Sequence, residues 1–113
     1  MNGATISRSV IGLRSRIGVG SQIEASYIMG ADYYQTWEDM LADREVNKPR
    51  IGIGEGSIIR RAIIDKNARI GNNVRLVNDA AVVNADAENG SYFIRDGIII
   101  VPKNAIVEDG TVV

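Results

Sequence analysis

The segment from Ala62 to Leu76 carries a large aliphatic residue at every sixth position, and this spacing constrains the fold more than any other feature. Ile64 and Ile70 belong to the series, and a small Ala68 lies four positions after the first of them. A helix would place apolar residues three and four apart, and a half-buried strand would alternate them. A period of six predicts one short strand followed by a corner. We therefore predict an all-β fold: a left-handed parallel β-helix of hexapeptide repeats, with a triangular cross-section.

The same spacing occurs in two further parts of the chain, which indicates an internal repeat. Arg16-Ile17-Gly18 corresponds to Arg69-Ile70-Gly71 when the first array is laid on the second. The predicted inward-facing residues are Ile6, Ile11, Ile17 and Ile23, then Ile53, Ile59, Ile64, Ile70 and Leu76, then Val101, Ile106 and Val112. Without the segments between the arrays, about seventy residues remain, enough for about four coils of about eighteen residues.

Residues 30–50 and 78–97 break the period, and we expect both to be insertions at corners of a single domain that spans residues 1–113. Thr36 and Asp39 have the spacing of a helix capping box, so the first insertion is predicted to contain a short helix that ends at Pro49.

The two insertions differ in their apolar residues. In the predicted helix of the first, the apolar face would consist of Trp37, Met40 and Leu41, packed on the outside of the prism. In the second, Asn89-Gly90 predicts a turn, and the segment 92–94 (Tyr-Phe-Ile) predicts a strand or a buried anchor.

Charge and composition exclude several functions. Thirteen Lys and Arg nearly balance fourteen Asp and Glu, and this balance argues against a nucleic-acid-binding protein. The sequence has no cysteine, which excludes disulfides and thiolate metal sites. No apolar run approaches the length of a membrane span, and the first residues lack the apolar core of a signal peptide. We therefore expect a cytoplasmic protein with no membrane partner.

Two groups of residues are typical of catalytic or phosphate sites but are better explained by the fold. Gly52, Gly54 and Gly56 suggest a phosphate-binding loop, but such a loop opens a helix, whereas more of the six-residue repeat follows here. We interpret them as corner glycines. The acidic residues of the first insertion are Asp32, Glu38, Asp39, Asp43 and Glu45. We interpret them as a solvated face, and we predict no catalytic residue.

The lysines indicate a binding site. Lys66 and Lys103 each lie between an array strand and an asparagine, in Asp65-Lys66-Asn67 and Pro102-Lys103-Asn104. Positions one coil apart in a β-helix stack at about 4.8 Å, so the two lysines are expected to lie on one wall. Converging Lys and Arg side chains bind phosphate or carboxylate groups. A solvated basic edge is the alternative interpretation, and the spacing alone does not exclude it.

The motifs around these lysines resemble a known family. They are SVIGLRSRIG at 9–18, MGADYY at 29–34, IGIGEGSIIRRAIIDKNARIG at 51–71 and YFIRDGIIIVPKNAIVEDGTVV at 92–113. Together they are similar to the C-terminal β-helix domain of glucose-1-phosphate adenylyltransferase, also called ADP-glucose pyrophosphorylase. The similarity covers most of the chain, with both insertions in the family's places. It is closer to the cyanobacterial, plant and related bacterial branches than to the enteric branch.

The resemblance implies a part in making ADP-glucose from ATP and glucose 1-phosphate, for glycogen or starch synthesis. In this family, Mg with ATP and the catalytic residues belong to an N-terminal nucleotidyltransferase domain, whose motifs are absent here. We therefore expect this chain alone to be inactive and to hold no cofactor. The implied partners are the catalytic domain, the other subunits of a tetramer, and an anionic effector such as 3-phosphoglycerate, orthophosphate or a sugar phosphate. The implied location is the bacterial cytoplasm or the plastid stroma of a plant.

Within the family, the β-helix domain supports tetramer assembly and contributes part of an allosteric effector pocket. By motif, the effector-binding lysines fall on Lys66 and Lys103. Secondary contacts are expected from three arginines in matching motifs, Arg60, Arg61 and Arg95. Pro102 replaces an aliphatic residue common in the plant sequences and restricts the backbone before Lys103, so the identity of the effector stays open.

Two other functions of this fold class can be compared with the sequence. Hexapeptide acyltransferases typically use a catalytic histidine, and β-helical carbonic anhydrases bind zinc through histidines. The sequence contains no histidine, which excludes both. A free-standing, non-catalytic scaffold is the alternative function. Residues 1–5 do not resemble the polar capping unit that a solenoid requires, so we expect structure upstream of them.

Overall fold

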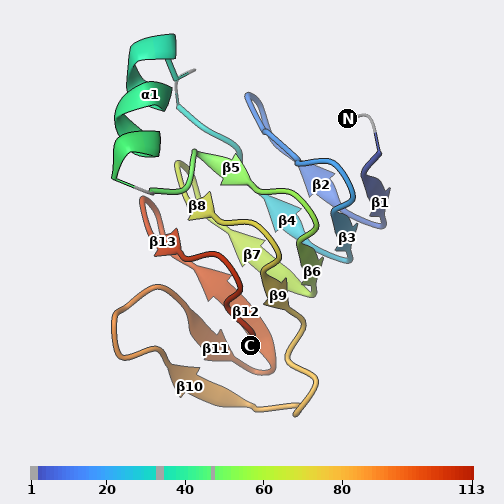
Figure 1. The fold of residues 1–113 in the computed structure, drawn as a ribbon. Coiled ribbons are helices and arrows are strands. Elements are labelled where there is room, and N and C mark those ends of the chain that lie inside the picture. The colour runs from blue at the N-terminus through green and yellow to red at the C-terminus, as the bar shows by residue number, and fades with distance from the viewer. Residues whose placement is uncertain (1–2, 33–34, 47) are drawn as a thin grey trace.

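The computed structural model describes residues 3–32, 35–46 and 48–113, and it is a three-sided coil of short strands (Figure 1). Each side of the prism is one sheet, and the chain passes from one sheet to the next at a tight corner. No helix in the described part of the chain is long and apolar enough to cross a membrane.

Three faces make up the described prism. The first has the order β1 (Thr5–Ser7), β3 (Gln22–Glu24), β6 (Ile58–Arg60), β9 (Arg75–Leu76). The second has the order β10 (Asn84–Asp86), β11 (Phe93–Arg95), β12 (Ile98–Val101), β7 (Ala62–Ile64), β4 (Tyr27–Ile28), β2 (Val10–Ile11). The third has the order β13 (Ile106–Val107), β8 (Arg69–Ile70), β5 (Gly52–Ile53), which a bridge from Ile17 to Ile53 extends. Every pairing between coils is parallel, as a β-helix requires.

Aliphatic side chains from the three faces meet inside the prism and stack on their counterparts in the next coil. On the first face Ile23 pairs with Ile59, and Ile59 with Leu76. On the third face Ile53 pairs with Ile70. All five are buried, and burial of each contributes roughly 1.5–3 kcal/mol. The first two arrays are therefore confirmed as core, although Ile6 and Ile11, in the first coil, are only partly buried.

Buried serines satisfy backbone groups between coils. The Ser21 hydroxyl donates to the carbonyl of Gly54 at 2.7 Å and accepts from the N–H of Ser57 at 3.2 Å. The Ser57 hydroxyl repeats this arrangement with the carbonyl of Gly71 at 2.9 Å and the N–H of Val74 at 3.2 Å. The small residues between the large aliphatic ones therefore have a hydrogen-bonding role as well as a steric one.

The third predicted array is right at Val101, which is fully buried, but it is off by one residue at its other two members. Val107, not Ile106, pairs with Ile70 and is 1% exposed. Val112 is 70% exposed, while Val113 packs against the core. In Ile106-Val107 and in Val112-Val113 two aliphatic residues are adjacent, so hydrophobicity alone does not tell which of the two points inward. The stack on Ile70 decides it, because only one member of each pair faces the prism interior.

Gly54 and Gly56 lie at a corner, as predicted, whereas Gly52 is a strand residue of β5. A Cβ atom on Gly54 would lie 2.4 Å from the carbonyl oxygen of Gly71, and one on Gly18 would lie 2.5 Å from that of Gly54. Successive coils touch backbone to backbone here, and no side chain fits between them. Gly56, with φ of 66°, leads into strand β6 rather than a helix, so the phosphate-loop interpretation does not apply.

The first insertion contains helix α1 (Trp37–Glu45), which lies beside the β5–β8–β13 face (Figure 1). Its predicted capping box is confirmed: the Thr36 hydroxyl accepts from the N–H of Asp39, and the Asp39 carboxylate accepts from the N–H of Thr36, both at 3.1 Å. The helix ends at Glu45, before Pro49. The predicted apolar contact is wrong, because Trp37 is 71% exposed and Leu41 is also exposed.

An ion pair attaches the helix instead. Asp43 is the buried residue of α1, and its carboxylate accepts from Arg69 on β8 at 2.5 Å and from the Gln35 amide at 2.7 Å. Burial alone raises the pKa of Asp43, but the hydrogen bonds from Arg69 and Gln35 outweigh burial and lower it. The prediction of a solvated acidic face is therefore wrong at Asp43.

The second insertion extends a sheet. Strands β10 and β11 form an antiparallel hairpin, and β11 pairs antiparallel with β12, so that Ile94 lies opposite Ile99. Ile94 is 3% exposed and belongs to the core cluster. The strand predicted at residues 92–94 is confirmed with a shift of one residue. The buried Asn78 side chain donates to the carbonyls of Val82 and Gly97, which closes the base of the insertion.

Candidate functional site

Lys66 and Lys103 occupy the same corner of the prism in successive coils. Each follows a strand of the second face, β7 or β12, and each precedes an asparagine in the left-handed region, Asn67 with φ of 61° and Asn104 with φ of 64°. The N–H of Asn104 donates to the carbonyl of Lys66 at 3.1 Å, which stacks the two turns. The asparagines are suited to this conformation because their short polar side chains tolerate it better than most residues.

Asp32 brings the two ammonium groups together. Its Oδ1 atom lies 3.4 Å from Lys66 Nζ, and its Oδ2 atom lies 3.5 Å from Lys103 Nζ. Asn67 holds this carboxylate in place, since its amide donates to Oδ2 at 3.1 Å while its Oδ1 atom accepts from the Asp32 N–H at 2.9 Å. The lysines therefore share one corner, as the stacking argument predicts, and both ammonium groups approach the Asp32 carboxylate, which that argument does not predict.

The electrostatics of this corner favour the ionised carboxylate. The Asn67 hydrogen bond is the largest influence on the pKa of Asp32 and lowers it. Desolvation, the second largest, raises it, but the hydrogen bond and charge of Lys66 and the charge of Lys103 also lower it, so the net shift is downward. All three charged side chains are about half exposed. Two ammonium groups against one carboxylate leave an excess of one positive charge that an arriving anion can use.

The arrangement has the chemistry of an anion site whose internal carboxylate acts as a competitor. A phosphate or carboxylate that displaces Asp32 would meet two donors already directed at one point. Nothing in this group of residues is a nucleophile placed against a base, so the arrangement favours binding rather than catalysis.

Pro102 does not disturb the stack. At this corner the N–H after each second-face strand donates to the following coil, as Asp65 does to the carbonyl of Val101 at 2.9 Å. Among the described residues, no coil follows Pro102 at this corner, so its missing N–H costs no hydrogen bond. The Asn104 to Lys66 hydrogen bond shows that Lys103 keeps its position.

The three arginines predicted as secondary contacts lie elsewhere. Arg60 and Arg61 precede β7, at the opposite end of that strand from Lys66, and Arg60 pairs with Glu24 at 3.3 Å. Arg95 lies at the same end of the sheet, because it is opposite Ile98 at the start of β12. It pairs with Asp86 at 2.7 Å and covers the Phe93 ring at 5.6 Å. The structure groups these arginines with one another rather than with the lysines.

Sequence reasoning missed Asp32 and Arg14. Asp32 lies in the motif MGADYY, and the sequence predicts only a solvated acidic residue there, because nothing in its neighbours marks it as a partner of residues far along the chain. Arg14 lies at the same corner in the preceding coil, next to Ala31. It has a φ of 58° and donates to the carbonyl of Ala31 at 3.2 Å. The available signal was its register, since it occupies the position equivalent to Asn67 and Asn104.

The stacked inward-facing aliphatic residues and the parallel pairing of strands on three faces define the class of protein, a parallel β-helix built from hexapeptide repeats. Residues 1–112 match the family model of the GLGC left-handed parallel β-helix domain, and the chain belongs to this family. It is thus a domain related to glucose-1-phosphate adenylyltransferase, and the resemblance inferred from the motifs is confirmed.

Proposed function

We propose that this chain is the regulatory and subunit-assembly domain of an ADP-glucose-forming glucose-1-phosphate adenylyltransferase. In this proposal, Lys66 and Lys103 form its share of an allosteric pocket for a phosphate-bearing metabolite. Catalysis, with Mg and ATP, belongs to a separate nucleotidyltransferase domain. The observation that carries the proposal is the convergence of both lysine ammonium groups on the Asp32 carboxylate, within 3.5 Å.

The effector class follows from the charge of the corner. A phosphate monoester carries nearly two negative charges at neutral pH, which matches the two lysines once Asp32 moves aside. Orthophosphate, 3-phosphoglycerate and sugar phosphates share this group, and they are the candidates. Two exposed lysines provide only part of a pocket, so we expect about millimolar affinity, near 4 kcal/mol, for this chain alone.

Assembly is supported by apolar surface at the coil nearest the N-terminus. Val10, Leu13 and Val19 are exposed there, in contrast to their aliphatic neighbours that point inward. Strand β1 is also an edge of the first face, with backbone groups free to meet another surface. A catalytic domain or another subunit is the partner we propose for this end of the prism.

The test is an NMR titration of the chain with orthophosphate, 3-phosphoglycerate and fructose 1,6-bisphosphate. We expect saturable shifts at Lys66 and Lys103 that disappear in Lys66→Ala and Lys103→Ala. Lys48→Ala is the matched control, because it removes the remaining lysine of the sequence, which does not pair with Asp32. Asp32→Asn should tighten binding about two- to fivefold, since it removes the internal competitor.

Two results would contradict the effector site. Binding that survives both lysine substitutions would place the anion elsewhere, and weaker binding in Asp32→Asn would mean that Asp32 is not a competitor. If no phosphate compound binds, and if adding a family nucleotidyltransferase domain does not change that, the free-standing scaffold becomes the better description.

A further inference from the structure

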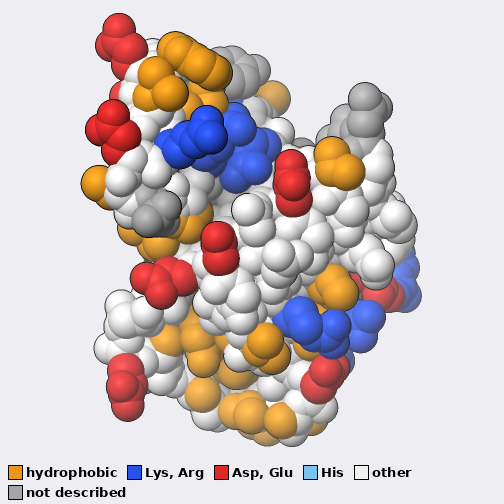
Figure 2. Space-filling model, viewed as in Figure 1, with side chains coloured by type: hydrophobic (Ala, Val, Ile, Leu, Met, Phe, Trp, Pro, Cys, Tyr) orange, Lys and Arg blue, Asp and Glu red, His pale blue; other side chains and the backbone are white. Residues whose placement is uncertain are grey.

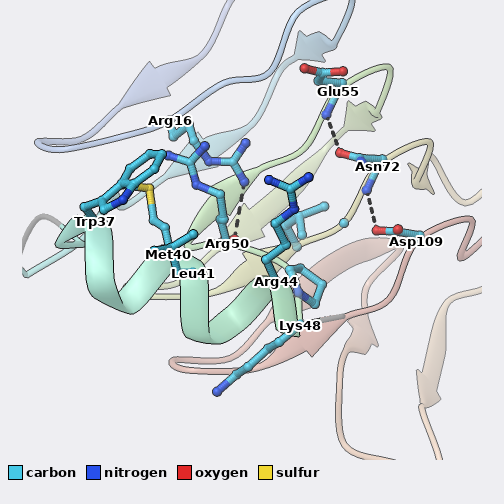
Figure 3. A pocket seen from close by; sticks show the side chains of 13 residues that line it. Arg16, Trp37, Met40, Leu41, Arg44, Lys48, Arg50, Glu55, Asn72 and Asp109 are labelled. Carbon is cyan, nitrogen blue, oxygen red and sulfur yellow. Dashed lines mark hydrogen bonds between the residues drawn. The ribbon is translucent and has the colours of Figure 1, made fainter. Parts of the chain in front are cut away.

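A cavity of about 440 Å³ lies between helix α1 and the third face of the prism (Figure 3). Its base includes Ile70 and Gly71 of the prism, and side chains of α1 form one wall. It is separate from the Lys66 and Lys103 corner, since neither lysine lines it. A volume of this size is typical of a small-molecule site and exceeds what a single phosphate fills.

Three arginines line this cavity, and Figure 3 shows their guanidinium groups on the same side of it. Arg16 comes from the third face, directly before Ile17, Arg44 from α1, and Arg50 from the segment before β5. Among the described residues none of the three forms an ion pair with a carboxylate, in contrast to Arg60, Arg69, Arg75 and Arg95. The same concentration of positive side chains is visible beside α1 in Figure 2.

Arg16 is held in position by backbone groups. Its Nε atom donates to the carbonyl of Ile51 at 3.1 Å, and one terminal nitrogen donates to the carbonyl of Arg50 at 3.4 Å. These bonds orient the guanidinium but leave further N–H groups available, because a guanidinium carries five donors. Burial and, to a smaller extent, the charge of Arg50 lower the pKa of Arg16 against an opposing effect of Glu55, and together these influences bring it to about 10. Arg16 stays protonated at neutral pH, and a bound anion would relieve the repulsion.

The other walls have a different character. Trp37, Met40 and Leu41 present apolar surface from α1, and Trp37 lies at the end of the cavity nearest Arg50 (Figure 3). On the opposite side Glu55, Asn72 and Asp109 form a ladder in which the N–H of Glu55 donates to Asn72 and the N–H of Asn72 donates to Asp109. The Glu55 carboxylate forms no ion pair or side-chain hydrogen bond with another described residue, and it is free to accept from a ligand hydroxyl.

We propose that this cavity is a second binding site that takes a nucleoside phosphate. Its phosphate lies among Arg16, Arg44 and Arg50, its flat base stacks on Trp37, and its hydroxyl groups donate to Glu55 and Asp109. Arginine suits phosphate because its planar fork matches two oxygens at once. The exposed indole suits a base because stacking covers apolar surface that water otherwise meets. The site is independent of the lysine corner.

The test follows the indole N–H signal of Trp37, the only tryptophan of the sequence, in an NMR titration. The probes are guanosine 5′-monophosphate, guanosine, orthophosphate and glucose 6-phosphate. We expect a saturable shift with guanosine 5′-monophosphate, and binding at least about tenfold weaker for each of the other three, because each lacks the base or the phosphate.

Arg50→Gln and Arg44→Gln should each weaken the nucleotide about tenfold, and Arg16→Gln should do the same if the variant remains folded by circular dichroism. Arg75→Gln, an exposed arginine outside the cavity, and Lys66→Ala should leave the indole titration unchanged. This last control separates the cavity from the proposed effector corner.

Two results would overturn the proposal. The absence of a saturable shift at about ten millimolar nucleotide, or equal binding by Arg44→Gln and Arg50→Gln, would show that the arginines do not form a phosphate site. Equal affinity for glucose 6-phosphate would show that no base is recognised, and the assignment to a nucleoside phosphate would be wrong.

Discussion

The two insertions branch from the same prism but are held to it by different interactions. The hairpin of β10 and β11 continues a sheet, adds backbone hydrogen bonds to β12, and places Ile94 in the core. Helix α1 buries one of its residues, Asp43, and leaves Trp37 and Leu41 exposed beside a cavity. The hairpin is thus part of the folded core, whereas the helix is held at its edge by an ion pair.

This difference explains where the candidate sites lie. The first insertion supplies Asp32 to the lysine corner and one wall of the arginine cavity. A segment with few buried apolar contacts can open locally without unfolding the core, and ligand-binding segments are commonly of this kind. The hairpin lacks this freedom, and its arginine, Arg95, is already occupied by Asp86 and Phe93.

The largest expected effect is the loss of core packing in the hairpin. Ile94→Ala should lower the free energy of unfolding by about 2–5 kcal/mol, because it leaves a cavity beside Ile99. Urea denaturation measures it. Ile98→Ala is the control, since Ile98 is 39% exposed and should cost below about 1 kcal/mol. Equal effects would mean that the hairpin is not integrated in the core.

The next effect concerns the attachment of α1. Asp43→Asn leaves Arg69, 13% exposed, without its countercharge and should lower the free energy of local opening of α1 by up to about 3 kcal/mol. Hydrogen exchange of the α1 amides measures this, and the core strands should change less. Glu45→Gln, on the exposed side of the helix, is the control. Equal loss of protection in the core strands would contradict local attachment.

The pH dependence should reveal the same ion pair. Because its hydrogen bonds lower the pKa of Asp43 in the folded state, the stabilisation is complete above the unfolded pKa of about 4 and is lost as the pH falls through the lower folded pKa. Urea denaturation between about pH 6 and pH 2 should show a steeper decline for the wild type than for Asp43→Asn. Parallel curves would show that Asp43 does not titrate differently on folding.

The smallest effect is expected at the helix cap. Thr36→Ala removes the hydroxyl that accepts from Asp39 and should destabilise α1 by about 1 kcal/mol, with no change in the core. The Cα chemical shifts of residues 37–45 report the helix content. Thr36→Ser keeps the hydroxyl and should behave as the wild type, so a loss of helix in that variant would point to a role of the methyl group instead.

Local patterns were sufficient where the structure repeats. The six-residue period identified Ile23, Ile59 and Ile70 as core, and the Thr36 and Asp39 spacing identified the start of α1. Each of these patterns involves only residues a few positions apart in the sequence. The period failed at Ile106 and Val107, where two aliphatic neighbours made the choice ambiguous. It also failed to show that Arg60, Arg61 and Arg95 lie away from Lys66.

The sequence by itself determined the coil: inward aliphatics at a period of six, with glycines at corners where backbones touch. It also determined that Lys66 and Lys103 share a wall, since stacking follows directly from the register. Only the tertiary structure decided that Asp32 lies between them, that Arg69 anchors Asp43, and that three arginines line one cavity with Trp37. The physical reason is distance along the chain. Pairs such as Asp32 with Asn67 and Asp43 with Arg69, 35 and 26 residues apart, depend on where an insertion returns to the prism, and no local period specifies that point.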